Sequence, residues 1–238
     1  MKLIIDIGNS VVKIALFKHK QLLRSAQFEN CSLKNVGNFL AKEIVSKTII
    51  SSVKNIDKVT LEVITKYKAL VLDEKTALPI KVNYKTPKTL GHDRVAGVVA
   101  ASCSNKDKNC LVLDFGSCLT IDFINADKEY IGGRISPGIM MRYNALHQFT
   151  DKLPLCKMTN TQNLIGNDTI SSINSGVQEG VIAEVIAVID AFRKENKDTV
   201  VILTGGDCFF FEKALKNSIF ANPFLVMEGL NEILDYNE

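Results

Sequence analysis

The chain has 238 residues, 46% of them hydrophobic and 23% charged, which is enough for one large domain or two small ones with a substantial core. A formal net charge of +3 is too small to indicate a nucleic-acid-binding protein, and no Lys/Arg run is interleaved with aromatic residues. The apolar start is broken by Asp6 and no run of about 18 apolar residues follows, so we expect a cytoplasmic protein with neither signal peptide nor membrane partner.

The first part of the chain alternates short β-rich and helical patterns. Gly8 and Asn9 are turn residues between two β-rich runs, and Ser32 is a suitable N-cap. The expected elements are strands over residues 3–7, 11–17 and 21–28, a helix over 32–46, a strand over 47–53, a helix over 57–66, a strand over 69–72, a loop over 73–89 and a helix that begins at Gly91.

Residues 111–124 then repeat the pattern of residues 3–17 without a gap. Both segments consist of an apolar triplet, Asp, an apolar residue, Gly, a small polar residue and a second strand, so Asp6 aligns with Asp114 and Gly8 with Gly116. A chance match between two buried strands is the alternative to a duplication. Because the matched strand continues after the turn, the sequence predicts two related domains, residues 1–110 and 111–238.

The second half continues with helices and strands of its own. Ile173, Val177, Val181, Val185 and Val188 form one apolar stripe of a long helix, in which Gly176 and Gly180 are unfavourable unless something packs closely there. The expected elements are a strand over residues 128–135, a helix after Pro137 (a residue that can occupy a first helical turn), a helix over 169–193, a strand over 199–203, and a helix with a short amphipathic tail.

The first hairpin carries the residue types that bind phosphate. Gly8 lets the backbone approach a ligand, and Asn9 and Ser10 can donate to phosphate oxygens. Asp6 suits a hydrated Mg²⁺ ion, and Lys13 can neutralise phosphate charge. An ordinary hairpin with a buried Asp is the alternative, but the second copy at residues 114–117 favours a nucleotide clamp.

Three further segments could contribute to such a site. Residues 132–138 are glycine-rich and precede a helix, and residues 204–207 (TGGD) follow a strand and could let an adenine base lie against backbone. Plain glycine turns are the alternative for both. Asp93 lies in the first turn of a helix, where the helix dipole favours a carboxylate, so a capping role is its alternative.

In this order and spacing, the motifs resemble those of the type III pantothenate kinases, in the superfamily of acetate and sugar kinases, heat-shock chaperones and actin. The resemblance covers nearly the whole chain. It rests on Asp6-x-Gly8-Asn9-Ser10-x-x-Lys13, Gly91-x-Asp93-Arg94, Asp114-x-Gly116-Ser117, Gly132-Gly133-x-Ile135-x-Pro137-Gly138, Gly166-x-x-Thr169 and Thr204-Gly205-Gly206-Asp207.

The resemblance implies an α/β fold of two duplicated actin-like (ribonuclease H-like) domains, each a mixed five-stranded sheet flanked by helices. It implies a homodimer that uses ATP to phosphorylate pantothenate to 4′-phosphopantothenate, the first step of coenzyme A biosynthesis. In this interpretation Asp93 is the proton acceptor, and Asp114 binds a monovalent cation such as potassium or ammonium. The implied ATP and phosphate contacts are Asp6, Ile7, Gly8, Asn9, Ser10, Val11, Val12, Lys13 and Ser117, and the implied pantothenate contacts are Tyr84, Gly91, His92, Asp93, Arg94 and Thr169.

The chain departs from the family pattern at two positions, with Ser117 where threonine is usual and Cys118 where alanine is usual. Two other functions are compatible with the two hairpins. A sugar or acetate kinase would lack the combination of Tyr84 with Gly91-x-Asp93-Arg94. A transcriptional accessory factor of the same family would bind nucleotide without kinase activity, but the intact Asp6, Asp93 and Asp114 favour the enzyme.

Overall fold

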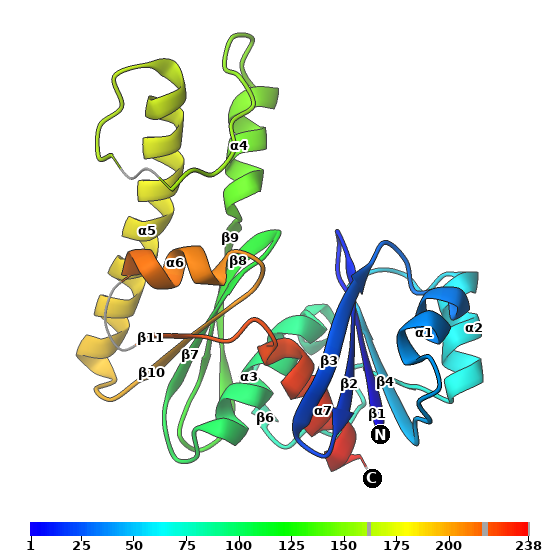
Figure 1. The fold of residues 1–238 in the computed structure, drawn as a ribbon. Coiled ribbons are helices and arrows are strands. Elements are labelled where there is room, and N and C mark those ends of the chain that lie inside the picture. The colour runs from blue at the N-terminus through cyan, green and yellow to red at the C-terminus, as the bar shows by residue number, and fades with distance from the viewer. Residues whose placement is uncertain (161–162, 216–218, 238) are drawn as a thin grey trace. The chain divides into compact units, whose positions relative to one another are not determined.

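The computed structural model describes residues 1–160, 163–215 and 219–237, which form two compact units (Figure 1). Unit 1 consists of Met1–Asp107, Ile124–Gly132 and Phe224–Glu238, and unit 2 of Lys108–Phe123 and Gly133–Pro223. None of the helices in the described ranges is both long and apolar enough to cross a membrane.

Unit 1 is built on a mixed sheet with the strand order β3-β2-β1-β4-β5. Strands β1–β2 and β2–β3 are antiparallel, whereas β1–β4 and β4–β5 are parallel. Helices α1 and α2 cover one face, and α3 and α7 pack on the other (Figure 1). The elements are β1 (Lys2–Ile7), β2 (Val12–Lys18), β3 (Gln21–Phe28), α1 (Leu33–Leu40), β4 (Lys47–Ser52), α2 (Lys58–Tyr67), β5 (Leu70–Val71), β6 (Lys81–Val82), the 3₁₀ turn η1 (Pro87–Thr89), α3 (His92–Ser104) and α7 (Leu225–Tyr236).

Unit 2 holds most of the second sheet, in which the strands β11-β10-β7-β8-β9 follow one another and β10 is parallel to both β7 and β11. Its core lies between these strands and residues of α4, α5 and α6. The elements are β7 (Cys110–Phe115), β8 (Cys118–Ile124), β9 (Glu129–Pro137), α4 (Ile139–Gln148), α5 (Thr169–Glu195), β10 (Val200–Thr204), α6 (Cys208–Leu215) and β11 (Ile219–Ala221).

The two sheets confirm the predicted duplication of a mixed α/β domain. In each sheet the two strands that follow the central strand in the chain lie on one side of it and two parallel strands lie on the other, and β1, β2, β3, β4 and β5 correspond to β7, β8, β9, β10 and β11. The expectation of five strands each needs one correction. The second sheet gains a sixth, β6, because Lys81 and Val82 pair with Glu129 and Tyr130 of β9.

Several element boundaries also differ from those expected. Helix α1 ends at Leu40 because Ala41 adopts a positive φ of 54° and its N–H bonds back to the Gly37 carbonyl. The helix expected after Pro137 is α4, which begins at Ile139 with Gly138 as its N-cap, whereas Pro137 itself ends β9 and does not lie in the first helical turn. The compact units also differ from a linear division at residue 110, since α7 packs against α3, β1 and β4 of unit 1.

Candidate functional site

The first hairpin joins β1 to β2 at one end of the unit 1 sheet. Asp6 and Lys13 are paired directly across the two strands, and the turn is closed by the Gly8 amide, which donates to the Val11 carbonyl at 3.0 Å. The tip residues Asn9, Ser10 and Val11 are exposed, so their backbone is accessible to a ligand. The flanking Ile7 and Val12 are buried in the core, so their side chains cannot contact ATP and only their backbone atoms could.

Asp6 is a buried carboxylate, with 7% of its surface exposed. Burial raises its pKa from 3.8 to about 6; the positive charge of Lys13 opposes this rise, and the negative charge of neighbouring Asp93 adds to it. Among the described residues, Asp6 Oδ1 has no hydrogen-bond partner, and neither has Ser51 Oγ. A buried carboxylate oxygen without a donor is a suitable ligand for Mg²⁺, so the residues present fit a magnesium site at Asp6.

Asp93 lies in the first turn of α3, close enough to Asp6 to raise its pKa. Its Oδ1 accepts a hydrogen bond from the Arg94 amide at 2.9 Å. Gly91 is the N-cap, and a Cβ there would lie 2.5 Å from Asp93 Oδ1, so only glycine leaves this carboxylate its position. The structure therefore brings three charged groups of unit 1 together: Asp6, Lys13 and Asp93.

Tyr84 and Arg94 form a second group next to Asp93 in the chain. The guanidinium of buried Arg94 lies 5.8 Å from the centroid of the Tyr84 ring, a cation–π geometry. The Tyr84 ring also contacts that of buried Tyr130, with the two centroids 5.9 Å apart. His92 is half-buried beside them. The pairing of β6 with β9 thus holds Tyr84 near the start of α3.

Helix α7 packs directly against α3, a contact that no sequence pattern indicated. A Cβ on Gly229 would lie 1.8 Å from the Ala96 carbonyl oxygen, so the two helices touch backbone to backbone at this point. No periodicity or motif relates Gly229 to Ala96, and only the packed fold shows that this glycine helps to place the helix that carries Asp93.

The second hairpin, in unit 2, is held by both glycine-rich segments. A Cβ on Gly138 would lie 2.4 Å from the Ser117 carbonyl oxygen, and a Cβ on Gly205 would lie 2.5 Å from Asp114 Oδ1. Gly205 also has a φ of +92°, which favours glycine on its own. Ser117 is exposed at the tip. The two glycine-rich segments, which the sequence suggested only separately, therefore meet at residues 114–117.

Asp114 is half-buried and is paired with Thr204 across the parallel strands β7 and β10. Thr204 is 1% exposed, and its Oγ1 has no hydrogen-bond partner among the described residues. The Asp114 carboxylate and the buried Thr204 hydroxyl, which has no hydrogen-bond partner among the described residues, supply oxygen ligands of the kind that a hard cation requires. The residues present therefore fit a monovalent cation at this position.

Thr169 begins α5, whose N-cap Asp168 forms a capping box with Ser171. It lines a cavity of about 740 Å³, and the residues that line this cavity do not include the second hairpin. A Cβ on Gly166 would lie 2.2 Å from the Ser172 amide nitrogen, so the loop before α5 runs directly against the helix. This packing requires glycine at position 166.

The same loop is tied to α5 by a buried glutamine. Gln178 Oε1 accepts from the Tyr143 hydroxyl at 3.0 Å and from the Thr159 amide at 2.8 Å, and its Nε2 donates to the Thr159 carbonyl at 2.9 Å. Further along the loop, Ser175 Oγ donates to the Leu164 carbonyl at 2.7 Å. Sequence reasoning missed both residues, because a polar side chain within a helix gives no sign of the loop that it binds.

Comparison with known proteins identifies the family of this chain. The family model of the type III pantothenate kinases matches residues 2–191. A protein of Bacteroides fragilis named type III pantothenate kinase is 42% identical over 239 residues, which cover 100% of this chain and 98% of that protein. A protein of Christiangramia forsetii with the same name is 42% identical over 241 residues, covering 100% and 99%.

Two solved structures support the fold alone, because their sequence identities are low. A Campylobacter jejuni protein described as a Baf family transcriptional activator aligns with a TM-score of 0.66 and 22% identity over 99% of this chain and 98% of its own. A glucokinase from an Antarctic psychrotroph aligns with a TM-score of 0.54 and 11% identity over 99% and 98%. The family match over most of the sequence and the full-length relatives decide the assignment, and the chain belongs to the type III pantothenate kinase family.

Proposed function

We propose that this chain transfers the γ-phosphoryl group of ATP to the primary hydroxyl of pantothenate, giving 4′-phosphopantothenate for coenzyme A biosynthesis. Membership of the family supports the reaction and the substrate. The observation that carries the proposal is that Asp6, Lys13 and Asp93 lie close together in unit 1, next to the turn that we propose to bind phosphate.

In this mechanism the chain supplies position and charge, which is most of what phosphoryl transfer needs. Asp93 accepts the proton of the pantothenate hydroxyl as that oxygen attacks the γ-phosphorus, and ADP leaves. Lys13 and the amides of residues 9 and 10 bind phosphate oxygens, with Ser117 as a further ATP contact. Asp6 would hold Mg²⁺, which when bound offsets the charge of the transferring group. Tyr84, Gly91, His92, Arg94 and Thr169 are proposed to bind pantothenate.

The proposal includes a monovalent cation, potassium or ammonium, at Asp114. An anionic carboxylate near phosphate would repel it by about 4 kcal/mol at 4 Å in a surface-like dielectric, and a bound cation removes that repulsion. The buried Thr204 hydroxyl, which has no partner among the described residues, supports this position. The alternatives are a strand-end carboxylate that only makes hydrogen bonds and a second Mg²⁺ ligand, and neither of them predicts that potassium stimulates activity through Asp114.

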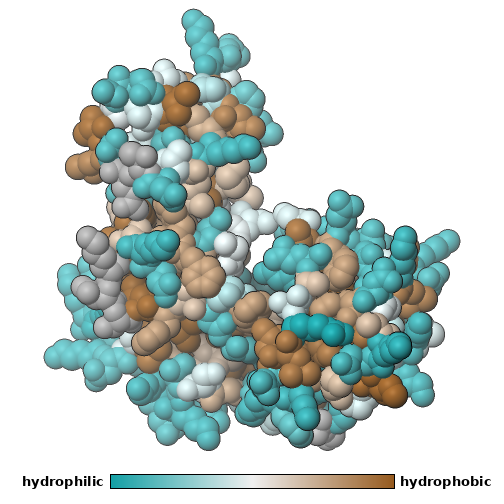
Figure 2. Space-filling model, viewed as in Figure 1, coloured by the Kyte–Doolittle hydropathy of each residue, from teal (hydrophilic) through white to brown (hydrophobic). Residues whose placement is uncertain are grey.

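A homodimer through unit 2 is also part of the proposal. Figure 2 shows apolar surface over α4, α5 and their connecting loop. A Cβ on Gly176 or Gly180 would meet nothing within 4 Å, so the described chain itself leaves this part of α5 open. The exposed large apolar residues of this region are Met140, Met141, Phe149, Leu155, Leu164, Ile165, Ile170 and Ile186. Light scattering should report the mass of a dimer, and the mass of a monomer at micromolar concentration in an active preparation would refute the proposed dimer.

The remaining parts of the proposal concern location and partners. We place the protein in the cytoplasm, where ATP is available, with no nucleic-acid or membrane partner, in keeping with its small net charge. The solved structures of a glucokinase and a transcriptional activator share the fold only, and no observation on this chain favours either of those functions over the kinase.

The experiment that tests the function is a steady-state assay of Asp93→Asn. This change keeps the shape of the side chain but removes the base, so kcat should fall by about 10² to 10⁴. Asp127→Asn is the matched control, because Asp127 is an exposed carboxylate of unit 1, and it should behave as wild type. Near wild-type turnover of Asp93→Asn would exclude Asp93 as the base.

A further inference from the structure

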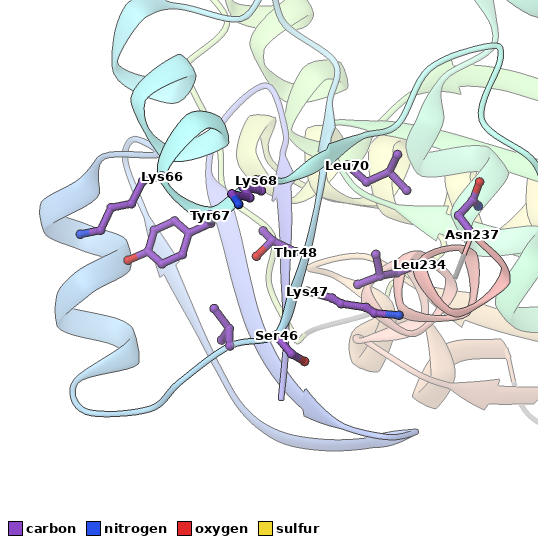
Figure 3. A pocket seen from close by; sticks show the side chains of 10 residues that line it. Ser46, Lys47, Thr48, Lys66, Tyr67, Lys68, Leu70, Leu234 and Asn237 are labelled. Atoms are coloured by element: carbon purple, nitrogen blue, oxygen red, sulfur yellow. The ribbon is translucent and has the colours of Figure 1, made fainter.

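A second cavity, of about 360 Å³, lies in unit 1 at the opposite end of the sheet from Asp6 (Figure 3). Along β1 and β4, Asp6 is paired with Ser51, whereas Thr48 in this cavity is paired with Leu3. Three residues of strand span about 10 Å. The cavity is therefore separate from the phosphate-binding hairpin. Its lining residues are Val45, Ser46, Lys47, Thr48, Lys66, Tyr67, Lys68, Leu70, Leu234 and Asn237.

All charged side chains of the lining are basic. Lys47, Lys66 and Lys68 line the cavity, and none of the ten lining residues is Asp or Glu. In Figure 3 the Lys66 chain runs beside Tyr67, with its ammonium 5.5 Å from the ring centroid, and Lys47 extends on the opposite side toward Leu234. Three flexible ammonium groups around one concave surface favour an anionic ligand over a neutral or cationic one.

The floor of the cavity adds an independent observation. Thr48 is only 2% exposed, and its Oγ1 makes no hydrogen bond to any described residue. Figure 3 shows this hydroxyl turned to the side of Tyr67. A buried hydroxyl without a partner is unfavourable, and valine would fill the same space in a strand without that cost. A ligand oxygen within the cavity would accept the hydrogen bond that Thr48 cannot make inside the protein.

We propose that this cavity binds the phosphate group of a small soluble metabolite, at a site distinct from that of ATP. A phosphate carries up to two negative charges and several acceptor oxygens, so it can engage the Thr48 hydroxyl and more than one lysine at once. A carboxylate carries one charge and two oxygens, and is therefore the weaker ligand here. A volume of about 360 Å³ is in the range of small-molecule sites.

The test is a titration of the ¹⁵N-labelled full chain with inorganic phosphate, followed by amide chemical shifts. Saturable shifts are expected at Thr48 and Lys68, and acetate at equal ionic strength should bind at least about 10-fold more weakly. In the double variant Lys66→Gln/Lys68→Gln the phosphate affinity should fall at least about 10-fold. The matched control Lys34→Gln/Lys42→Gln removes the same charge from exposed positions of unit 1 and should bind as wild type.

Thr48→Val provides a second variant that tests the hydroxyl itself. It should weaken phosphate binding at the cavity while the melting temperature stays equal to or above that of wild type. Amide shifts at Gly8 and Asn9 report phosphate binding at the hairpin proposed to bind ATP. Loss of binding at that hairpin can therefore be distinguished from loss of binding at Thr48. Absence of saturable shifts at Thr48 and Lys68, or equal affinity in the Lys66/Lys68 variant and its control, would overturn the proposal.

Discussion

Replacing Asp6 with asparagine should stabilise the protein at neutral pH while it removes kinase activity. Burial raises the pKa of Asp6 from 3.8 to about 6, and the charged form is therefore disfavoured in the folded state. Since one pKa unit is worth about 1.4 kcal/mol, the ionised carboxylate costs about 3 kcal/mol of folding free energy at pH 7. Asparagine carries no charge. It should regain part of this cost, the rest being offset because Lys13 loses its anionic neighbour.

The pH dependence follows from the direction of the shift. The folded state binds the Asp6 proton more tightly than the unfolded chain does. The stabilisation that comes from this proton is therefore present below about pH 4 and is lost as the pH rises through 6. Urea denaturation of wild type and Asp6→Asn between pH 4.5 and 7.5 measures it. The variant should exceed wild type by up to about 3 kcal/mol at pH 7.5, and the difference should shrink toward pH 4.5.

Two controls keep this prediction sharp. Asp127→Asn, at an exposed carboxylate, should change neither the stability nor its pH dependence. Mg²⁺ should stabilise wild type but not Asp6→Asn, because only the carboxylate attracts the ion. If Asp6→Asn is less stable than wild type at pH 7.5, or if the difference between them does not vary with pH, the assignment of a buried, destabilised carboxylate is wrong.

Three further outcomes are expected. Gly229→Ala should lower the free energy of unfolding in urea by at least about 2 kcal/mol, since its Cβ would lie 1.8 Å from the Ala96 oxygen. The control Gly37→Ala, whose Cβ would meet nothing within 4 Å, should raise it slightly. Equal effects of the two substitutions would contradict the packing of α7 on α3. Gln178→Leu loses three hydrogen bonds and should cost about 1–3 kcal/mol in the same assay, so an unchanged midpoint would refute its role in holding the loop. Activity should rise as potassium or ammonium replaces sodium at constant ionic strength, and stimulation that survives unchanged in Asp114→Asn would exclude a cation at that residue.

The parts of the fold that could be predicted are those encoded by local pattern. The alternation of apolar residues around Asp6 and Asp114, each followed by a glycine turn, predicts two equivalent hairpins, and the two sheets share the corresponding strand order. The long helix was predicted from the 3.6-residue spacing of its apolar residues, and α5 buries Ile173, Val177 and Val181 as expected. Local pattern suffices here because each element carries its own period.

Contacts between distant segments could not be predicted in the same way. Gly138 and Gly205 could each belong to a plain turn, and only their fit against residues 114–117 explains why a side chain is excluded. The strand β6 is two residues long, too short for any period to show, and it forms because β9 offers a free edge. Helix α7 follows unit 2 in the chain but packs in unit 1, where α3 and β1 cover its apolar face.

Product identification tests the central claim most directly. The purified chain is incubated with ATP, Mg²⁺, potassium and pantothenate, and the products are analysed by mass spectrometry together with ADP release. We predict one phosphate added to pantothenate for each ADP formed, with no comparable product from glucose or acetate, and loss of the product in Asp93→Asn but not in Asp127→Asn. ADP release that does not depend on pantothenate, or phosphorylation of glucose or acetate in its place, would contradict the account.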